Sequence, residues 1–209
     1  MTIANGATGE RRYGGRTAEQ RRADRRERLL DAGLELFATT GYASTTIEGL
    51  CAAASLNARY FYEQFRNREE LLAAVYRRHV ASVMAEVEAA IAGTADPAVR
   101  LEAGLRAFVE ATLADERGAR VNYLEMVGVS PALEELRRNV DREYAELITR
   151  EAARLPRIGT RPRERRREIA VALVGAVDGL ILDWLSSDRS RPSSTIVDTL
   201  ITVFGPTIG

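Results

Sequence analysis

The sequence predicts an all-α protein, and three observations support this class. Apolar residues recur mainly at the three- and four-residue spacing of an amphipathic helix. Glycine and proline divide the chain into segments of helical length. No segment shows a convincing alternation of apolar and polar residues, which is the pattern of a half-buried strand. A chain of 209 residues suits a small domain followed by a medium one, so we expect two helical parts.

The charge of the chain is balanced overall but uneven along its length. Thirty arginines offset thirty acidic residues, which counts mildly against a polybasic protein that binds nucleic acid without regard to sequence. Within residues 1–30, however, there are eight arginines and four acidic residues. We expect residues 1–19 to form a flexible basic arm. It either contacts the phosphate backbone or minor groove of a nucleic acid or is only a solvated tail.

The composition offers little that could support catalysis or metal binding. Cys51 is the single cysteine and His79 the single histidine, so we expect no internal disulfide and no zinc site built from His and Cys. A glycine-rich phosphate loop or another cofactor fingerprint is also missing from the sequence. We therefore expect no metal, no cofactor and no enzymatic activity, and an all-helical enzyme is the less favoured alternative.

The chain carries no sequence signal for export or for a membrane. No window approaches the roughly 18 uninterrupted apolar residues of a membrane span, and the N-terminus is polar and rich in arginine. We expect a cytoplasmic protein without a membrane partner.

The first helix is expected from about Thr17 or Arg21 to Thr40. Gly41 should end it by adopting the left-handed conformation that glycine tolerates, and Tyr42 should pack back on it. Its inner stripe consists of Leu29, Leu30, Ala32, Gly33, Leu36 and Phe37.

Two short helices joined by a tight turn are expected next, which is the layout of a helix-turn-helix. Thr45 and Glu48 have the spacing of a capping box, so the first of the two should begin near Thr46. The chain should turn at Ser55 and Leu56, and Asn57 is a good N-cap for the second helix. Asn67 and Glu70 form a second box-like start, which opens a long helix. We expect residues 20–68 to be a helix-turn-helix DNA-binding domain.

The second short helix should present a polar face to solvent. Helical spacing turns Leu56, Phe61 and Phe65 inward. The same spacing leaves a small, cationic, phenolic and amide surface outside, formed by Ala58, Arg59, Tyr60, Tyr62 and Gln64.

At these residues the chain resembles the tetracycline-repressor (TetR) family of bacterial transcription regulators. The resemblance rests on FATTGYASTTIEGLCAAAS, on Phe61 and Tyr62 followed by Phe65, and on NREEL. It is close over residues 25–75 and looser up to GAVDGLILDWLSSD. The family commonly has glycine at the position of Ser55, and Ala58, Arg59 and Tyr60 also depart from its pattern, so the operator sequence cannot be carried over from a relative.

The resemblance implies a sequence-specific regulator that binds double-stranded operator DNA. Arg59 could fork onto guanine, although an ion pair with Glu63 four residues away competes with that contact. Tyr62 matches a tyrosine that contacts phosphate in the family, and Thr46 and Arg68 could contact phosphates at helix starts. The complete set of expected DNA-binding residues is Thr46, Asn57, Ala58, Arg59, Tyr60, Tyr62, Gln64 and Arg68.

Downstream of residue 68 the pattern remains helical. Asp96 and Pro97 should cap one helix, which should close at residues 116–118, and Ser130 with Pro131 should start a long charged helix that ends near Leu155. A short helix, 121–127, is expected between them, and an arginine-rich loop at 157–163 precedes a helix to about Ser186 and a last helix to about Pro206. We expect residues 69–209 to bind an effector and to form a dimer.

The segment EIAVALVGAVDGLILDWLSS is apolar around most of its helical circumference, so it must be covered on two sides. A second copy of the chain is the simplest cover, and a two-fold dimer suits a palindromic operator. The alternative is a central buried helix in a monomer. The expected interface residues are Gly175, Gly179, Ile181, Trp184, Ile196, Leu200, Val203 and Phe204.

The family resemblance further implies that a small molecule binds inside the C-terminal part and changes the affinity for the operator. Asp178 and Asp183 stand out as acids in an apolar helix. The pocket candidates, each of which could instead be plain core, are Tyr76, His79, Phe108, Tyr123, Met126, Tyr144, Asp178 and Trp184. The expected function is a repressor that the effector releases from DNA, and the alternative is an architectural DNA-binding protein without effector control.

Overall fold

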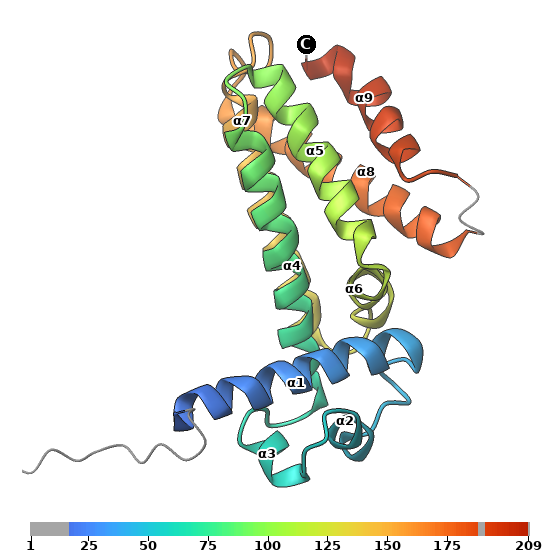
Figure 1. Ribbon diagram of the computed structural model, residues 1–209. Helices are drawn as coiled ribbons and strands as arrows, with labels where there is room; N and C mark the ends of the chain where they lie inside the picture. The colour runs from blue at the N-terminus through green and yellow to red at the C-terminus, as the bar shows by residue number, and fades with distance from the viewer. Residues whose placement is uncertain (1–16, 188–190, 209) are drawn as a thin grey trace, which may run out of the picture.

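The computed structural model describes residues 17–187 and 191–208, and these residues are helical throughout with turns between the helices (Figure 1). This confirms the all-α prediction. Residues 1–16 of the expected basic arm lie outside the described part. The helices are α1 (Ala18–Thr39), α2 (Ile47–Ala53), α3 (Ala58–Tyr62), α4 (Arg68–Ala92), α5 (Pro97–Ala114), α6 (Glu116–Arg120), the π-helix η1 (Val121–Glu125), α7 (Pro131–Ala152), α8 (Arg163–Ser186) and α9 (Ser194–Ile208).

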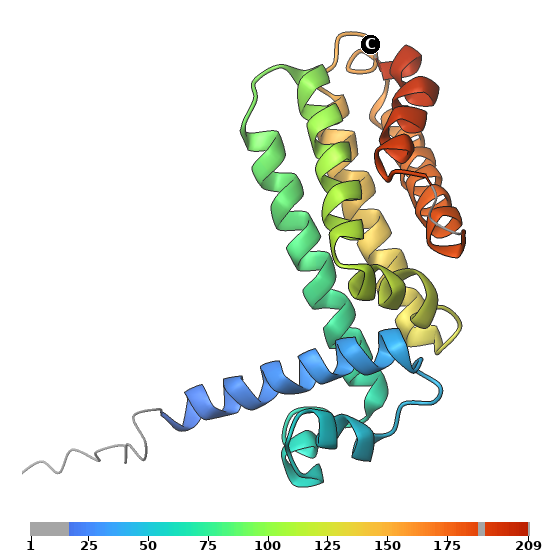
Figure 2. The same cartoon turned by 45° about the vertical axis from the view of Figure 1, so that its right-hand side comes forward.

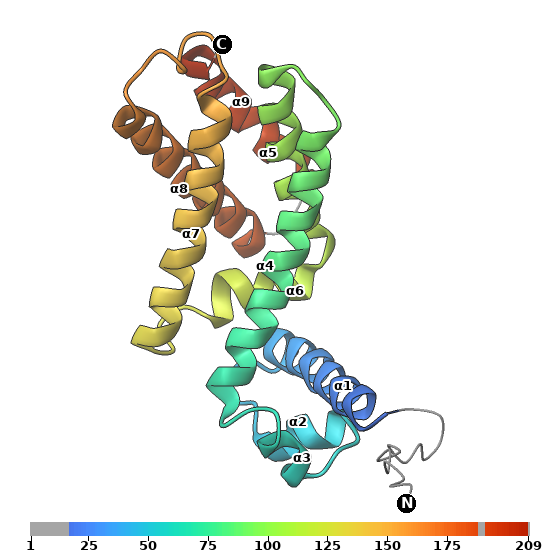
Figure 3. The ribbon, with the colours of Figure 1, turned by 90° about the vertical axis from the view of Figure 1, so that its left-hand side faces the viewer.

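The helices form a small N-terminal unit, α1–α3, and a long C-terminal bundle, α4–α9. α4 leaves the N-terminal unit and runs along α5, while α6 and η1 lie above α1 (Figures 1 and 2). α7 packs on α8, and α9 packs on α5 and α8 (Figure 3). The N-terminal unit therefore touches the bundle through α4, α6 and η1 rather than through a free linker.

Several predicted helix ends occur where the sequence signals lie. Thr17 begins α1 in a full capping box with Gln20, and Gly41 follows the helix with a φ of +85°. Asn57 and Asn67 cap α3 and α4, with side-chain oxygens that accept the amides of Tyr60 at 3.2 Å and Glu70 at 2.8 Å.

The capping box predicted for Thr45 and Glu48 is wrong. Thr46 caps α2 instead, and its hydroxyl accepts the amide of Gly49 at 3.1 Å. Thr45 is buried, and its hydroxyl donates to the carbonyl of Gly41 at 2.8 Å. The turn after Gly41 points Thr45 into the core, so the helix begins one residue later than the box would place it.

The region between α5 and α7 also differs from the prediction. Asp115 leaves helical geometry and ends α5, so the segment expected to close that helix forms α6 instead. α6 continues into the π-helix η1, where the amide of Met126 bonds to the carbonyl of Val121 at 3.1 Å. Such π-helical turns are rare and occur frequently at functional sites.

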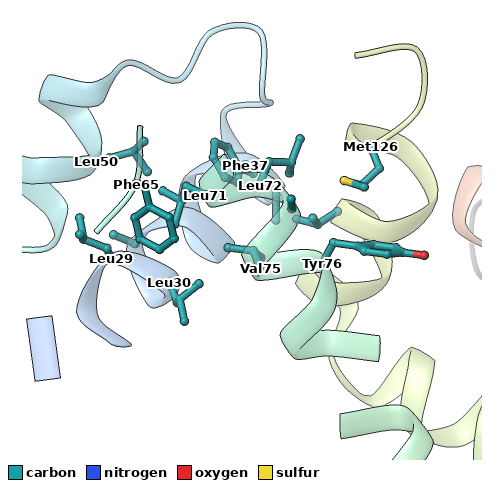
Figure 4. Close-up of a cluster of buried hydrophobic side chains, with 14 of the residues drawn as sticks. Leu29, Leu30, Phe37, Leu50, Phe65, Leu71, Leu72, Val75, Tyr76 and Met126 are labelled. Atoms are coloured by element: carbon teal, nitrogen blue, oxygen red, sulfur yellow. The ribbon is translucent and has the colours of Figure 1, made fainter. Parts of the chain in front are cut away.

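Two main apolar clusters hold the fold together. The first joins the N-terminal unit to the bundle, because Leu29 and Phe37 of α1 share it with Leu72 and Tyr76 of α4 and with Met126 (Figure 4). The second lies among α5, α8 and α9. α4 contributes to the core of the N-terminal unit, so packing does not separate the chain at residue 68. The division into 20–68 and 69–209 therefore remains a prediction about function.

By length and composition, α8 is apolar enough to cross a membrane. In the fold it is one helix of the bundle, and it packs on α7 and α9.

Candidate DNA-reading surface and ligand cavity

α3 exposes one face and buries the other. Phe61 and the following Phe65 are buried, and both belong to the core shared with α1 and α4. Ala58, Arg59 and Tyr62 are exposed on the opposite face, with Tyr62 59% accessible. A short helix with a packed inner face and a free polar outer face is what groove insertion requires.

The turn between α2 and α3 depends on an arginine that the sequence patterns do not reveal. Ser55 adopts a φ of +50°, the left-handed region in which glycine is common. The guanidinium of Arg28 on α1 donates to the carbonyl of Ser55 at 2.9 Å and to the carbonyl of Ala54. These bonds satisfy carbonyls at the end of α2, and they fix the angle at which α3 leaves the turn.

Tyr60 and Gln64 are half-buried, although the helical spacing placed them outside. The guanidinium of Arg25 lies 4.5 Å from the ring centroid of Tyr60 and also pairs with Glu63 at 3.8 Å. The amide nitrogen of Gln64 is buried without a partner among the described residues. Tyr60 therefore packs behind the exposed face of α3 and helps to hold this helix against α1.

Arg59 forms the ion pair that the spacing predicted as a competitor of base contact. Its Nε donates to Glu63 Oε1 at 3.2 Å, while its side chain remains 84% exposed. A pair this exposed stabilises by only a few tenths of a kcal/mol, and so it can open when DNA binds.

Arg68 and Thr46 are engaged within the protein. One Nη of Arg68 donates to the carbonyl of Tyr42 at 3.1 Å and to that of Thr45, and its guanidinium faces the Tyr42 ring. Arg68 therefore holds the loop between α1 and α2, which weakens the expectation that it contacts phosphate. Thr46 is exposed, and its hydroxyl hydrogen is still free to donate.

A cavity with a mostly apolar lining lies between α4, α5, η1, α7 and α8. Tyr76 and Ile91 both line it and are fifteen positions apart on α4, which corresponds to roughly 22 Å of helix. The cavity is therefore elongated along the bundle. Five of the eight predicted pocket residues line it: Tyr76, Phe108, Tyr123, Tyr144 and Asp178.

The cavity is polar near the N-terminal unit. Tyr123 donates its hydroxyl to Asp178 Oδ1 at 3.1 Å, and Asp141 and Arg137 line the same end. Burial raises the pKa of Asp178 to about 6; the charge of Asp141 adds to the shift, and the bond from Tyr123 and the charge of Arg137 oppose it. Burial also raises the pKa of Asp141 and of the neighbouring tyrosines, Tyr76, Tyr123 and Tyr144.

The far end of the cavity is apolar and is closed by an ion pair. Arg100 donates to both carboxylate oxygens of Glu151, at 2.9 and 3.2 Å, and to the carbonyls of Thr94 at 2.9 Å and of Ile91. Since its guanidinium is occupied in this way, Arg100 acts as a clip that holds α5, α7 and the end of α4 together. The 51 positions between the two residues gave no sequence signal for this pair.

The other three predicted pocket residues lie outside the cavity lining. His79 packs between α4 and α6, against Gly118, and burial lowers its pKa. Met126 is fully buried in the core next to α1. Trp184 donates its indole N–H to the carbonyl of Arg191 at 2.9 Å and packs in the cluster of α8 and α9.

The predicted interface residues divide into two groups. Ile181, Trp184, Ile196 and Leu200 are buried in the core of their own chain, so they cannot be the surface that a second copy would meet. Gly175, Gly179 and Val203 are exposed, and Phe204 is half-buried. Two exposed apolar residues that the prediction omitted, Val171 and Leu182, lie on the same helix as the glycines.

η1 connects the cavity to the N-terminal unit. Asn122 and Tyr123 line the cavity, while two residues later Glu125 accepts the backbone amide of Tyr42 at 2.9 Å. Next to η1, Arg117 of α6 pairs with Glu35 of α1 at 2.9 Å. Any movement of Tyr123 would therefore occur close in the chain to the contacts that orient α1.

The chain is similar to known transcriptional regulators over most of its length. The sequence profile described as "Bacterial regulatory proteins, tetR family" matches residues 29–75. The HTH-type transcriptional activator FasR of Mycolicibacterium smegmatis is 27% identical over 181 residues, which make up 85% of this chain and 80% of that protein.

Solved structures share the fold as well. The fatty acid degradation regulator FadR of Bacillus halodurans superposes with a TM-score of 0.76 at 18% identity, covering 86% of this chain and 93% of that chain. FadR of Bacillus subtilis, in complex with stearoyl-CoA, superposes with a TM-score of 0.71 at 16% identity, covering 84% and 97%. The matched profile and the FasR relative confirm the resemblance and the expectation that the chain is not an enzyme. Residues 29–75 therefore carry the DNA-binding domain of the TetR family of bacterial regulatory proteins, and most of the chain shares its fold with solved transcriptional regulators.

Proposed function

We propose that this regulator binds a palindromic operator as a two-fold dimer and that an acyl-CoA or a related acyl compound changes its affinity for that operator. The observation that carries the proposal is the elongated cavity whose polar end is connected, through η1, to the end of α1.

The shape and lining of the cavity favour an acyl chain. Its far half is lined by aliphatic residues, among them Val87, Ile91, Leu101, Leu105 and Ile148. Each methylene group buried there contributes about 0.8 kcal/mol to binding. The Bacillus subtilis relative was solved with stearoyl-CoA, which has the same combination of a long apolar chain and a polar group.

DNA contact is assigned to the exposed residues of the helix-turn-helix. Arg59 is the candidate for a guanine, Tyr62 and Thr46 are candidates for phosphates, and Asn57 and Ala58 lie at the exposed start of α3. Tyr60, Gln64 and Arg68 complete the predicted set. Their internal contacts support a role in holding α3 and its loops in position.

The dimer is assigned to the exposed face of α8 and to α9. Gly175 and Gly179 have open space where a side chain would be, which allows the helix of a second copy to approach closely. Val171, Leu182 and Val203 supply apolar area beside them. Two reading helices one turn of duplex apart, roughly 34 Å, would then face successive major grooves.

Transmission is assigned to η1. A ligand that displaces Tyr123 from Asp178 moves the helix that carries Glu125, and Glu125 holds the amide of Tyr42. For control to result, the ligand must prefer one arrangement of the N-terminal units, since equal affinity for both shifts nothing.

Release from the operator, and so relief of repression, is the proposed direction of control. Activation is the second candidate, because the FasR relative is described as a transcriptional activator. A cytoplasmic location follows from operator binding and is part of the proposal.

Sequencing the DNA fragments that the purified protein retains would identify the operator. Titration of that operator with and without palmitoyl-CoA then tests the control. We expect specific binding far tighter than non-specific binding at fixed salt and a change of at least about fivefold with ligand. Uniform binding to all fragments would favour an architectural protein, and specific binding that no acyl compound alters would reject the proposed effector class.

A further inference from the structure

Two carboxyl groups meet at the polar end of the cavity. Asp178 comes from α8 and Asp141 from α7, and both line the space. Burial makes both carboxyl groups costly to ionise, and the charge of Asp141 adds to that cost for Asp178. The DNA-reading function gives no reason to place two acids here.

Little positive charge balances them. The groups that face Asp178 are Tyr76 of α4, Tyr123 of η1, and Arg137, Asp141 and Tyr144 of α7. Arg137 is the cation that acts on both acids, and it also pairs weakly with Glu134 at 3.8 Å. Arg142 acts on Asp141 as well, but it is half exposed and pairs with Glu135 at 2.7 Å. Arg100, the other cation that lines the cavity, is bound to Glu151 at the opposite end.

We propose that this pair of acids is a charge filter: it rejects acyl compounds that end in a free carboxylate and admits those whose acyl group is neutral, such as thioesters, amides and esters. The inference rests on the proposed function, because it concerns the same cavity. Asp178 and Asp141 become specificity-determining residues for the effector.

The physical reason is the difference between a charge and a dipole in a poorly hydrated space. A carboxylate beside Asp178 and Asp141 adds a third negative group where screening by water is weak. A neutral carbonyl adds no charge, and it can accept a hydrogen bond from a tyrosine hydroxyl or from the protonated form of Asp178. Discrimination of this kind acts by repelling the wrong ligand rather than by attracting the right one.

The test compares two ligands that differ only at this group, dodecanoate and N-methyl dodecanamide, by isothermal titration calorimetry on the full chain at pH 8. We expect the amide to bind at least about tenfold more tightly. Asp178→Asn and Asp141→Asn should each tighten dodecanoate binding several-fold and leave the amide within about threefold. Asp183→Asn is the matched control, since Asp183 is an exposed acid on the same helix that pairs with Arg191.

Acidification supplies a second readout that does not depend on a variant. As the pH falls through about 6, Asp178 takes up a proton, and the preference of the wild-type protein for the amide should shrink. In Asp178→Asn the preference should change less over the same range.

The outcomes separate the two proposals. Equal binding of both ligands to the wild-type protein, or full discrimination in both Asn variants, would overturn the filter and leave the acyl effector standing. Failure of the amide, of dodecanoate and of dodecanoyl-CoA to bind would overturn the effector class, and the filter with it.

Discussion

At the scale of single residues, arginines serve two different purposes around the helix-turn-helix. Arg59 projects into solvent from α3, whereas Arg25, Arg28 and Arg68 make contacts within the protein. The guanidinium fork suits both purposes, because it can bind a guanine edge or two backbone carbonyls. Their different exposure leads to different expectations for each arginine.

Arg59→Ala should relax base preference at one operator position and weaken binding to the best operator by roughly 5- to 160-fold, the value of one bidentate guanine contact. The circular dichroism spectrum should not change. Arg66→Ala is the control, because Arg66 is equally exposed and makes the same kind of i,i+4 pair, with Glu70 at 3.3 Å. Selection of binding sites from random DNA measures the effect, and an unaltered site profile would reject the guanine assignment.

Arg68→Ala should lower the free energy of unfolding by about 1 to 3 kcal/mol, because the carbonyls of Tyr42 and Thr45 lose their donor. Urea unfolding of Arg68→Ala and Arg66→Ala measures the difference. If Arg68→Ala had normal stability but weaker, salt-sensitive DNA binding, Arg68 would instead be assigned to phosphate contact.

Asp178→Asn should stabilise the free protein at pH 8 and have little effect near pH 4. The pKa of Asp178 is raised in the folded state, so ionising this carboxyl costs more in the folded protein than in the unfolded chain. The stability that its protonated form provides is therefore present at low pH and is lost as the pH rises through about 6. Thermal unfolding at both pH values checks the sign, and equal stabilisation at both would place the effect elsewhere.

At the scale of elements, η1 matters more than its five residues suggest. It continues directly from α6, and it carries a cavity residue, Tyr123, and a contact to α1, Glu125, two positions apart. Residues two positions apart on a helix point to roughly opposite sides, so Tyr123 can face the cavity while Glu125 faces α1.

Glu125→Ala should uncouple ligand from DNA. We expect the affinity for palmitoyl-CoA to stay within a few-fold of the wild type. The ratio of the operator affinities with and without ligand should fall toward one, because Glu125 is proposed to carry the coupling between the two sites. Glu88→Ala, on the exposed side of α4, is the control. A full ligand response in Glu125→Ala would show that η1 does not transmit the effect of the ligand to the N-terminal unit.

At the scale of the whole molecule, two reading units must be held at a fixed separation. The exposed face of α8, with Gly175, Gly179 and Leu182, is the proposed contact, and it lies apart from the N-terminal unit (Figure 1). Trp184 is unsuitable as a test of this contact, because it is buried in its own chain and its replacement would disturb folding.

Leu182→Arg should produce monomers in light scattering and lower operator affinity at least about tenfold, because a charge replaces apolar area at the contact. Leu182 is 41% exposed, so the single chain should keep its helical content. Val127→Arg, at an exposed apolar position near the N-terminal unit, should leave the oligomeric state unchanged. A persistent dimer in Leu182→Arg would remove this face from the interface.

The helical class, most helix ends and the exposure of Ala58, Arg59 and Tyr62 on α3 could be predicted from the sequence, because caps, breakers and helical spacing act over a few residues. The motifs of residues 25–75 also carried the resemblance to the TetR family, which the matched profile confirms. Other features became visible only in the folded chain: Thr45 turns inward, Arg28 and Arg68 hold loops, and Ile181 and Leu200 belong to the core. Tyr123, Asp141 and Asp178, from three different helices, line one cavity. These facts depend on contacts between segments far apart in the chain, and no local pattern records which distant side chain will fill a given space.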